Sequence, residues 1–252
     1  MEPLHNESES RMAVALITGA SRGLGFALAR ALADRNWDLV VDGRGRPALE
    51  TAAAELAGAG DATVTAVTGD VADAAHRLEM VEAARQLGGL DLLVNNASVL
   101  GPSPQPDLAG YPIDVLRHVY DVNVLAPLAL AQLALPLLGD VVAGGILNIT
   151  SDAAVEGYEG WGGYGSSKAA LEQWSNVLAA EQPRLRVWWV DPGDMRTQMH
   201  QEAFPDEDIS DRPPPEQSAP GLLRLLDDAM PSGRYRTSEL ADVALVAPGV
   251  EA

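Results

Sequence analysis

The chain has 252 residues, with 17 Lys and Arg against 36 Asp and Glu, a formal net charge of −19 and no cysteine. Such acidity disfavours nucleic acid and anionic membrane surfaces as partners, because Lys and Arg supply the affinity for phosphate groups. The missing cysteine excludes disulfides, thiolate zinc sites and cysteine nucleophiles, and it fits a cytoplasmic location. The hydrophobic fraction of 47% is enough to build a substantial core. Among the basic residues only Lys168 is a lysine.

The two ends of the chain differ from the regular pattern between them. Residues 1–11 are predicted to be a flexible acidic tail, without the basic and apolar segments of a signal peptide. No uncharged apolar run reaches about 18 residues, so we expect no membrane span. Residues 12–240 are predicted to form one domain, and residues 241–252 a C-terminal tail without an assigned role.

Between these ends, short apolar segments alternate with helical segments of about 12 residues, the pattern of βαβ units. Segments of this kind are typical of a parallel sheet with helices on both faces. The sequence therefore predicts an α/β fold with a single doubly wound, Rossmann-like sheet. The expected strands are 12–17, 38–41, 63–67, 90–94, 145–149 and 186–190, and the expected helices are 23–35, an Ala-rich segment after residue 47, 74–87, 113–138 and 164–181.

One long segment breaks this alternation. Residues 205–217 combine proline with acidic residues, so they cannot form a central strand or a regular helix. Long irregular insertions in compact domains are usually functional lids or disordered. Because the segment follows the sixth predicted strand, we interpret residues 194–220 as a substrate lid.

A glycine-rich turn follows the first strand. Residues 18–25 read Thr-Gly-Ala-Ser-Arg-Gly-Leu-Gly, with glycines at 19, 23 and 25. A turn that brings backbone N–H groups close to a diphosphate and opens a helix needs glycine at such positions, and the helix N-terminus favours anions. Between a predicted strand and a predicted helix, this turn indicates dinucleotide binding.

The end of the second strand bears on which dinucleotide is bound. An acidic residue there binds the ribose of NAD, whereas arginine accommodates the 2′-phosphate of NADP. Arg44 lies just after the strand and Arg22 lies within the glycine-rich turn, which favours NADP. Asp42 is the alternative: if the strand ended one residue earlier, Asp42 would face the ribose and NAD would be preferred.

Four polar residues form a candidate catalytic set. Tyr164 and Lys168 are four apart on a predicted helix and share a face. A phenol has a pKa near 10, so it needs a neighbour such as an ammonium to stabilise its anion, and that ammonium can also bind the cofactor ribose. Ser151 ends a strand and can polarise a carbonyl beside Tyr164. Asn123, in a predicted helix, either supports a proton relay or marks a kink.

In their order and spacing these residues resemble the short-chain dehydrogenase/reductase family, over about residues 13–199. The resemblance implies that Asn123, Ser151, Tyr164 and Lys168 are catalytic. The family's Asn-Asn-Ala-Gly element appears as Asn-Asn-Ala-Ser, so Ser98 replaces its glycine and puts any backbone geometry that requires glycine there in doubt. The residues expected to bind the cofactor are Thr18, Gly19, Ser21, Arg22, Gly23, Leu24, Gly25, Arg44, Asp70, Val71, Asn96, Ala97, Tyr164, Lys168, Pro192, Gly193 and Thr197.

The resemblance implies hydride transfer between NADPH and a carbonyl or alcohol, in a homo-oligomer joined through helices near 113–138 and 164–181. Epimerisation, dehydration, reduction of a C=N or C=C bond, and a non-catalytic dinucleotide-binding regulator remain alternatives. The four histidines share no metal-ligand spacing, so no metal is expected. Aromatic and Met side chains near the site favour an apolar or aromatic carbonyl substrate. They are Tyr158, Trp161, Met195, Met199, His200 and Phe204.

Overall fold

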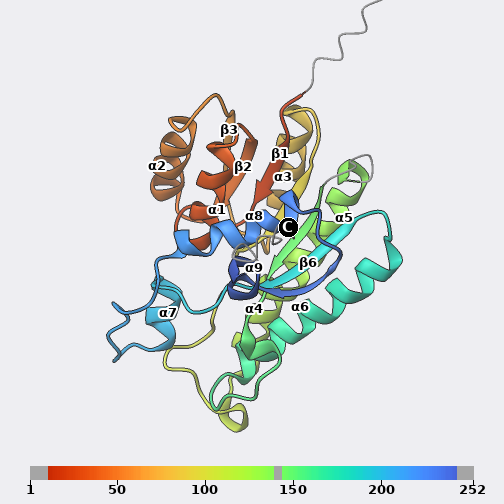
Figure 1. Ribbon diagram of the computed structural model, residues 1–252. Coiled ribbons are helices and arrows are strands. Elements are labelled where there is room, and N and C mark those ends of the chain that lie inside the picture. The colour runs from red at the N-terminus through yellow and green to blue at the C-terminus, as the bar shows by residue number, and fades with distance from the viewer. Residues whose placement is uncertain (1–10, 139–143, 243–252) are drawn as a thin grey trace, which may run out of the picture.

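The computed structural model describes residues 11–138 and 144–242, and it contains one parallel sheet of seven strands flanked by helices (Figure 1). The strand order is β3-β2-β1-β4-β5-β6-β7, and every neighbouring pair is parallel. The predicted doubly wound, Rossmann-like fold is confirmed. The strands are β1 (Val14–Ile17), β2 (Asp38–Gly43), β3 (Val64–Thr68), β4 (Leu92–Asn95), β5 (Gly145–Ile149), β6 (Arg186–Asp191) and β7 (Gly233–Arg236).

Side chains of the central strand alternate between two hydrophobic cores, one on each face of the sheet. Ala15 and Ile17 belong to one core, and Val14 and Leu16 to the other, as the two-residue period of a strand requires. Leucines of α1 (Gly23–Ala33), α2 (Arg46–Ala57) and α8 (Ala219–Asp227) fill the first core. The second core is filled from α3 (Ala74–Gln86), α5 (Ala126–Leu138) and α6 (Gly162–Glu181).

The strand order reverses at β1, which lies between β2 and β4. In open α/β sheets, ligands bind beside such a reversal, outside the carboxyl ends of the strands. The glycine-rich turn follows β1, and the loop that contains Ser98 follows β4, so both flank this crevice. The fold therefore brings the predicted dinucleotide turn and the predicted catalytic residues to one edge of the sheet.

The predicted helix 113–138 is not a uniform α-helix. It consists of α4 (Ile113–Tyr120), a π-helical turn (Asp121–Leu125) and α5, and Asn123 lies in the π-helical turn. By length and composition this stretch is apolar enough to cross a membrane, but half of its most apolar window is buried inside the fold, as in a core helix. Short π-helical turns inside α-helices often occur at functional sites.

Further differences from the predicted elements concern β2, the edge strand β7 and the predicted lid. Strand β2 continues two residues further than predicted, to Gly43. The edge strand β7 was not predicted, because its sequence Gly-Arg-Tyr-Arg is polar and only partly buried. The predicted lid contains a short helix, α7 (Gln198–Ala203), and residues 205–217 form turns and a 3₁₀ helix (Pro215–Gln217) but no strand or α-helix. A last helix, α9 (Thr237–Asp242), follows β7. The predicted tails lie almost entirely outside the described residues.

Candidate active site

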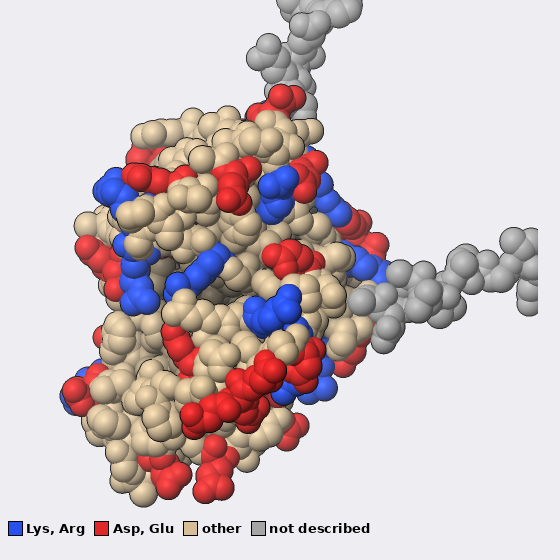
Figure 2. All heavy atoms as spheres, turned by 90° about the vertical axis from the view of Figure 1, so that its left-hand side faces the viewer, with Lys and Arg blue, Asp and Glu red and all other residues tan. Residues whose placement is uncertain are grey.

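A cavity of about 1530 Å³ lies along the carboxyl ends of the strands. The glycine-rich turn lines one end of it, and Ser151 and Tyr164 line the other. Sites for one small molecule usually measure about 300–1,000 Å³, so this cavity has room for a dinucleotide and a substrate together. Figure 2 shows a hollow on this face, with basic side chains at its edge and acidic side chains across the surface below it.

The glycine-rich turn has the backbone shape that its sequence predicts. Gly19 and Gly23 have φ angles of +67° and +60°, which other residues rarely adopt. A Cβ atom at Gly25 would lie 2.5 Å from Nδ2 of Asn96 and 2.6 Å from the Gly19 carbonyl oxygen, so only glycine fits there. Asn96 Nδ2 donates to the Thr18 carbonyl oxygen at 2.8 Å. The Thr18 hydroxyl oxygen in turn accepts the N–H groups of Asn96 and Ala97, both at 3.0 Å. Thr18 and Asn96 therefore fasten the turn to the end of β4.

The first turn of α1 offers free backbone donors to the cavity. The first backbone hydrogen bond of the helix is donated by the Phe26 N–H to the Arg22 carbonyl oxygen. The N–H groups of Gly23, Leu24 and Gly25 therefore have no partner within the helix. No side chain caps this end, and its first turn holds no acidic residue. Uncapped donors at a helix N-terminus bind phosphate groups. This arrangement fits the diphosphate of a nicotinamide dinucleotide.

Asp42 lies under the turn rather than beside a ribose. Its side chain is buried, and Oδ1 accepts the N–H of Gly19 at 2.6 Å. Its Oδ2 lies 3.0 Å from Nε2 of His76, a buried residue of α3. The alternative in which the second strand ends early and Asp42 faces the ribose is therefore wrong for this structure, because β2 extends past Asp42 and both of its carboxylate oxygens have protein partners.

Arg22 and Arg44 are exposed and line the same end of the cavity. Within the described residues, neither guanidinium forms an ion pair or a hydrogen bond to a carboxylate. In a chain with a net charge of −19, two unpaired cations at one place are an anion-binding feature. Arg44 follows the end of β2 and Arg22 lies in the glycine-rich turn, so the two cations come from neighbouring strand ends.

The remaining predicted cofactor residues also line the cavity, and several have structural partners there. Asp70 accepts the N–H of Ala72 at 2.9 Å, and Val71 follows it. Thr197 accepts the N–H of His200 at 3.3 Å and caps α7. Ser21, Ala97, Pro192 and Gly193 line the cavity as well, and Gly193 has a φ angle of +75°.

Tyr164 and Lys168 lie together in the buried part of the site. Burial raises the pKa of Tyr164, whereas the neighbouring hydroxyls of Ser98 and Ser151 lower it. The Nζ atom of Lys168 lies 5.5 Å from the centre of the Tyr164 ring and donates to the Ile149 carbonyl oxygen at 2.8 Å. Burial lowers the pKa of Lys168 to about 7, because the ammonium loses hydration.

The side-chain amide of Asn123 is fully hydrogen-bonded to protein. Its Nδ2 donates to the Val99 carbonyl oxygen at 2.9 Å and to Oγ of Ser167 at 3.0 Å. Its Oδ1 accepts the Val99 N–H at 2.9 Å and the Ser98 hydroxyl at 3.1 Å. An amide side chain has two donor hydrogens and two acceptor lone pairs, so none is left for water. Asn123 thus joins the π-helical turn to the loop after β4 and to α6.

Ser151 is positioned by the strand that sequence reasoning missed. Its hydroxyl donates to Oδ1 of Asp152 at 3.0 Å, and its oxygen accepts the Ala153 N–H at 3.2 Å. Arg234 of β7 donates to the Ser151 carbonyl oxygen at 3.3 Å and to Oε1 of Glu172 at 2.9 Å. The edge strand β7 therefore holds the backbone of Ser151 in place through Arg234.

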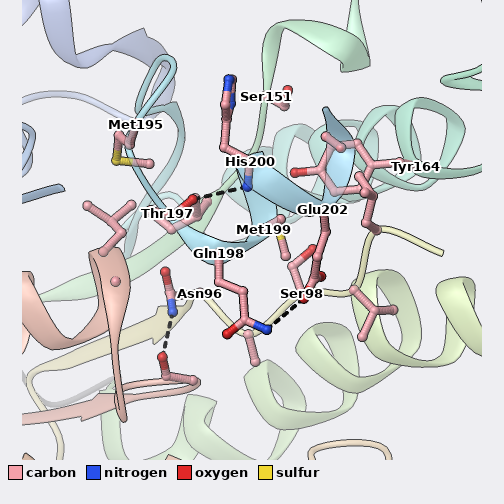
Figure 3. A pocket seen from close by; sticks show the side chains of 18 of the residues that line it. Asn96, Ser98, Ser151, Tyr164, Met195, Thr197, Gln198, Met199, His200 and Glu202 are labelled. Atoms are coloured by element: carbon pink, nitrogen blue, oxygen red, sulfur yellow. Dashed lines mark hydrogen bonds between the residues drawn. The ribbon is translucent and has the colours of Figure 1, made fainter. Parts of the chain in front are cut away.

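An aromatic ring of the loop before α6 packs against Tyr164, and Met199 and His200 of α7 lie across the cavity from it (Figure 3). The Trp161 ring lies 5.8 Å from the rings of both Tyr164 and Phe204, and 6.5 Å from Tyr158. The ring of His200 on α7 lies 5.0 Å from Phe204. Met199 and Leu100 add apolar contacts around Tyr164. This part of the cavity is apolar, with carboxylates of Asp152, Glu156 and Glu202 along its lining.

Sequence reasoning missed three contributors to the site. The sequence indicates Asp42 only as an alternative ribose ligand, because its partner His76 lies 34 residues away. The sequence indicates Ser98 only as a replacement of glycine, and its hydroxyl bonds Asn123, which is 25 residues away. Arg234 had no sequence signal, because the strand that carries it was not predicted. Among the described residues, no group of three or more His, Cys, Asp or Glu is arranged to hold a metal ion.

Comparison with known proteins agrees with this geometry. Residues 13–208 match the family model of short chain dehydrogenases. A benzil reductase ((S)-benzoin forming) of Saccharomyces cerevisiae is 32% identical, over 91% of this chain and 85% of that protein. The L-xylo-3-hexulose reductase of Hypocrea jecorina is 36% identical, over 76% of this chain and 69% of that protein.

Two solved structures have the same fold. A short chain dehydrogenase from Pseudomonas syringae superposes with a TM-score of 0.84 and 32% identity, covering 89% of this chain and 93% of that one. A short chain dehydrogenase from Shigella flexneri, complexed with NADP, gives a TM-score of 0.84 and 29% identity, over 90% and 97% of the two chains. The chain therefore belongs to the short-chain dehydrogenase/reductase family of oxidoreductases.

Proposed function

We propose that this protein is an NADPH-dependent reductase of apolar, aromatic ketones or diketones, with Tyr164 as the proton donor. The observation that carries the proposal is that Tyr164 and Ser151 line one end of a cavity whose other end has the shape of a dinucleotide site. Lys168 lies beside the tyrosine ring, buried in the same site.

The choice of NADPH rests on charge. Arg22 and Arg44 are unpaired cations within the described part of the chain and line the end of the cavity where the adenosine would lie. The carboxylate of Asp42 is held by Gly19 and His76, so it is not directed at a ribose. The similar Shigella flexneri structure is complexed with NADP, which supports the same choice.

The proposed reaction assigns one task to each polar side chain. When bound, NADPH supplies the hydride to the carbonyl carbon. Ser151 turns its hydroxyl from Asp152 to the carbonyl oxygen, and Tyr164 gives its proton to that oxygen as it becomes an alkoxide. Lys168, whose pKa is lowered to about 7, gains its proton more readily beside the tyrosine anion, because each charge stabilises the other. Asn123 holds the loop after β4 against α6.

The proposed substrate class follows from the lining near Tyr164. Trp161 and Met199 offer a flat and a flexible apolar surface, which suit aromatic rings. The name of the yeast relative describes a benzil reductase, and benzil is a diketone with two phenyl rings. The carboxylates of Asp152, Glu156 and Glu202 disfavour anionic substrates.

The deciding experiment follows NADPH consumption with benzil, with an aliphatic ketone, with an imine and with an enone. We expect turnover of benzil at the highest kcat/KM and slower turnover with NADH. The Tyr164→Phe variant keeps the ring and removes the proton, so we expect at least a thousandfold loss of kcat with an unchanged Kd for NADPH. Wild-type turnover by this variant would contradict the role of Tyr164. Consumption of NADPH with the imine or the enone alone would instead indicate reduction of a C=N or C=C bond.

A further inference from the structure

The carboxylate of Asp152 lies beside the hydroxyl that polarises the carbonyl in the proposed reaction. Its Oδ1 accepts the Ser151 hydroxyl at 3.0 Å, and its Oδ2 accepts the Tyr158 hydroxyl at 3.0 Å. The backbone N–H of Ala153 holds the Ser151 oxygen from another side, at 3.2 Å. Asp152, Ser151 and Tyr158 all line the cavity. A group bound at the Ser151 hydroxyl therefore has a carboxylate oxygen as its neighbour.

Substrate binding takes a hydrogen-bond donor away from this carboxylate. In the proposed reaction Ser151 turns its proton from Asp152 to the carbonyl oxygen. Among the described residues, Ser151 is the only donor to Oδ1 of Asp152. An ionised carboxylate is an acceptor only, and leaving it without a donor in a closed site is destabilising. Water can supply a donor in the open cavity, but a substrate that fills this end displaces it. A substrate that brings its own donor restores the lost hydrogen bond.

We propose that Asp152 is a specificity-determining residue that favours α-hydroxy ketones, in which a hydroxyl stands on the carbon next to the reacting carbonyl. This inference rests on the proposed function and names a narrower substrate class for the same site. The carbonyl oxygen and Oδ1 of Asp152 share the Ser151 hydroxyl as a neighbour, so the group that reaches Oδ1 must stand close to the carbonyl along the substrate. A hydroxyl on the adjacent carbon meets this condition, whereas a hydroxyl on the far side of an aromatic ring does not.

The chemistry of a carboxylate explains why the adjacent group must be a donor. A hydrogen bond to an ionised acceptor is roughly twice as strong as one between neutral groups, so a single hydroxyl is enough to discriminate. A methoxy group or a second carbonyl at the same place presents only acceptor lone pairs to Asp152. The surroundings suit an uncharged donor, because Ala153 is buried in the same apolar cluster as Tyr164.

The test compares benzoin with deoxybenzoin, which has the same two phenyl rings and the same carbonyl but lacks the hydroxyl. O-methylbenzoin is the third substrate, because it keeps the oxygen and loses the donor. In the wild type we expect kcat/KM with NADPH to be about tenfold higher for the preferred enantiomer of benzoin than for either of the others. We expect this ratio to fall to about threefold in Asp152→Asn, whose amide oxygen is an uncharged acceptor, and to about one in Asp152→Ala.

The change in this ratio isolates the contact with Asp152. The intrinsic reactivity of each ketone is the same for every variant, and a general effect of Asp152 on the position of Ser151 lowers both rates together. Glu159→Gln is the matched control, since it removes one negative charge from the same loop. Glu159 is exposed and does not line the cavity, so we expect the wild-type ratio. Equal ratios in the wild type, Asp152→Asn and Asp152→Ala would overturn the proposal.

A second measurement does not need turnover. In the Tyr164→Phe variant with NADPH bound, calorimetry measures the Kd of benzoin and of deoxybenzoin. We expect benzoin to bind about tenfold more tightly, and the difference to disappear when Asp152→Ala is added. Equal or absent binding of the two ketones would also overturn the proposal. If the wild type reduced no ketone but this Asp152-dependent preference were present, the proposed function would fail and the recognition of the hydroxyl by Asp152 would stand.

Discussion

Asp42 and His76 form a buried pair beneath the glycine-rich turn, with Oδ2 of Asp42 3.0 Å from Nε2 of the histidine. The other carboxylate oxygen accepts the N–H of Gly19 at 2.6 Å. The backbone adds a second link, because the Ala20 N–H donates to the Asp42 carbonyl oxygen at 2.9 Å. The shape of the cofactor turn therefore depends on a contact between β2 and α3.

This relationship predicts that Asp42→Ala affects both stability and cofactor binding. The substitution leaves the Gly19 N–H and His76 without their buried partner, so we expect the free energy of unfolding to fall by about 2–4 kcal/mol. We expect the Kd for NADPH to rise about tenfold, because the turn loses its anchor. Urea unfolding and fluorescence titration measure the two effects.

The control for Asp42→Ala is Asp38→Ala, at the other end of β2. Asp38 also accepts a backbone N–H, from Thr63 at 2.7 Å, but in an exposed place far from the cavity. We expect it to cost about 1 kcal/mol and to leave the Kd for NADPH unchanged. Equal effects of the two substitutions on NADPH binding would contradict the anchoring role of Asp42.

Arg44→Ala is expected to weaken NADPH about ten- to a hundredfold and NADH much less, because a charge-assisted contact to a 2′-phosphate is lost. Arg22→Ala is expected to act in the same direction. Arg46→Ala is the matched control, since Arg46 pairs with Glu50 at 3.6 Å. Calorimetric titration of each variant and of the wild type with both dinucleotides measures the dissociation constants. An equal loss for NADPH and NADH in Arg44→Ala would argue against phosphate recognition.

Lys168 predicts a dependence of stability on pH. Its pKa is lowered from an ordinary value of 10.5 to about 7 by burial, so between these values the unfolded chain binds a proton that the folded chain lacks. The free energy of unfolding therefore rises with pH, by about 2–3 kcal/mol between pH 7 and 9. Lys168→Met should remove this rise and increase stability at pH 6. Urea unfolding of the wild type and of Lys168→Met at several pH values below pH 10, where tyrosine stays neutral, measures this rise. Parallel dependence of the free energy of unfolding on pH in the two proteins would contradict a lowered pKa of Lys168.

The same lowered pKa makes Lys168 a reactive amine. At pH 8 we expect a small amine reagent to modify it slowly, because the side chain is buried but lines the cavity, and bound NADPH should protect it. Peptide mass spectrometry locates the label, and the N-terminal amine of the same chain serves as the unprotected reference. Labelling at the same rate with saturating NADPH would count against a cofactor beside Lys168.

Trp161→Ala tests the proposed substrate surface. The substitution removes the ring that contacts Tyr164 and Phe204, so we expect KM for benzil to rise about tenfold while the Kd for NADPH is unchanged. A small aliphatic ketone, which cannot use the indole surface, serves as the matched control. Equal losses with both substrates would show that Trp161 acts by supporting Tyr164.

Most of the fold could be predicted from the sequence because its strands are short apolar runs between helices of regular period. The exception, β7, has side chains that are all partly exposed, so it carries no such signal. The glycine-rich turn and the Tyr164–Lys168 pair could be found because each depends on local spacing. The partners of Asp42 and of Ser98 could not, since they come from α3 and from the π-helical turn, and only the fold sets those distances.

The π-helical turn at Asp121–Leu125 also fixes how the chain can vary in length there. A π-helical turn holds one residue more than the α-helical turn it replaces. Deleting a single residue would let α4 and α5 merge into one regular helix and rotate the side chain at position 123 by about 100° relative to α5. The amide would then leave the loop after β4, although every residue type of the site was still present. In this protein the count of residues before Ala126 matters as much as their identity.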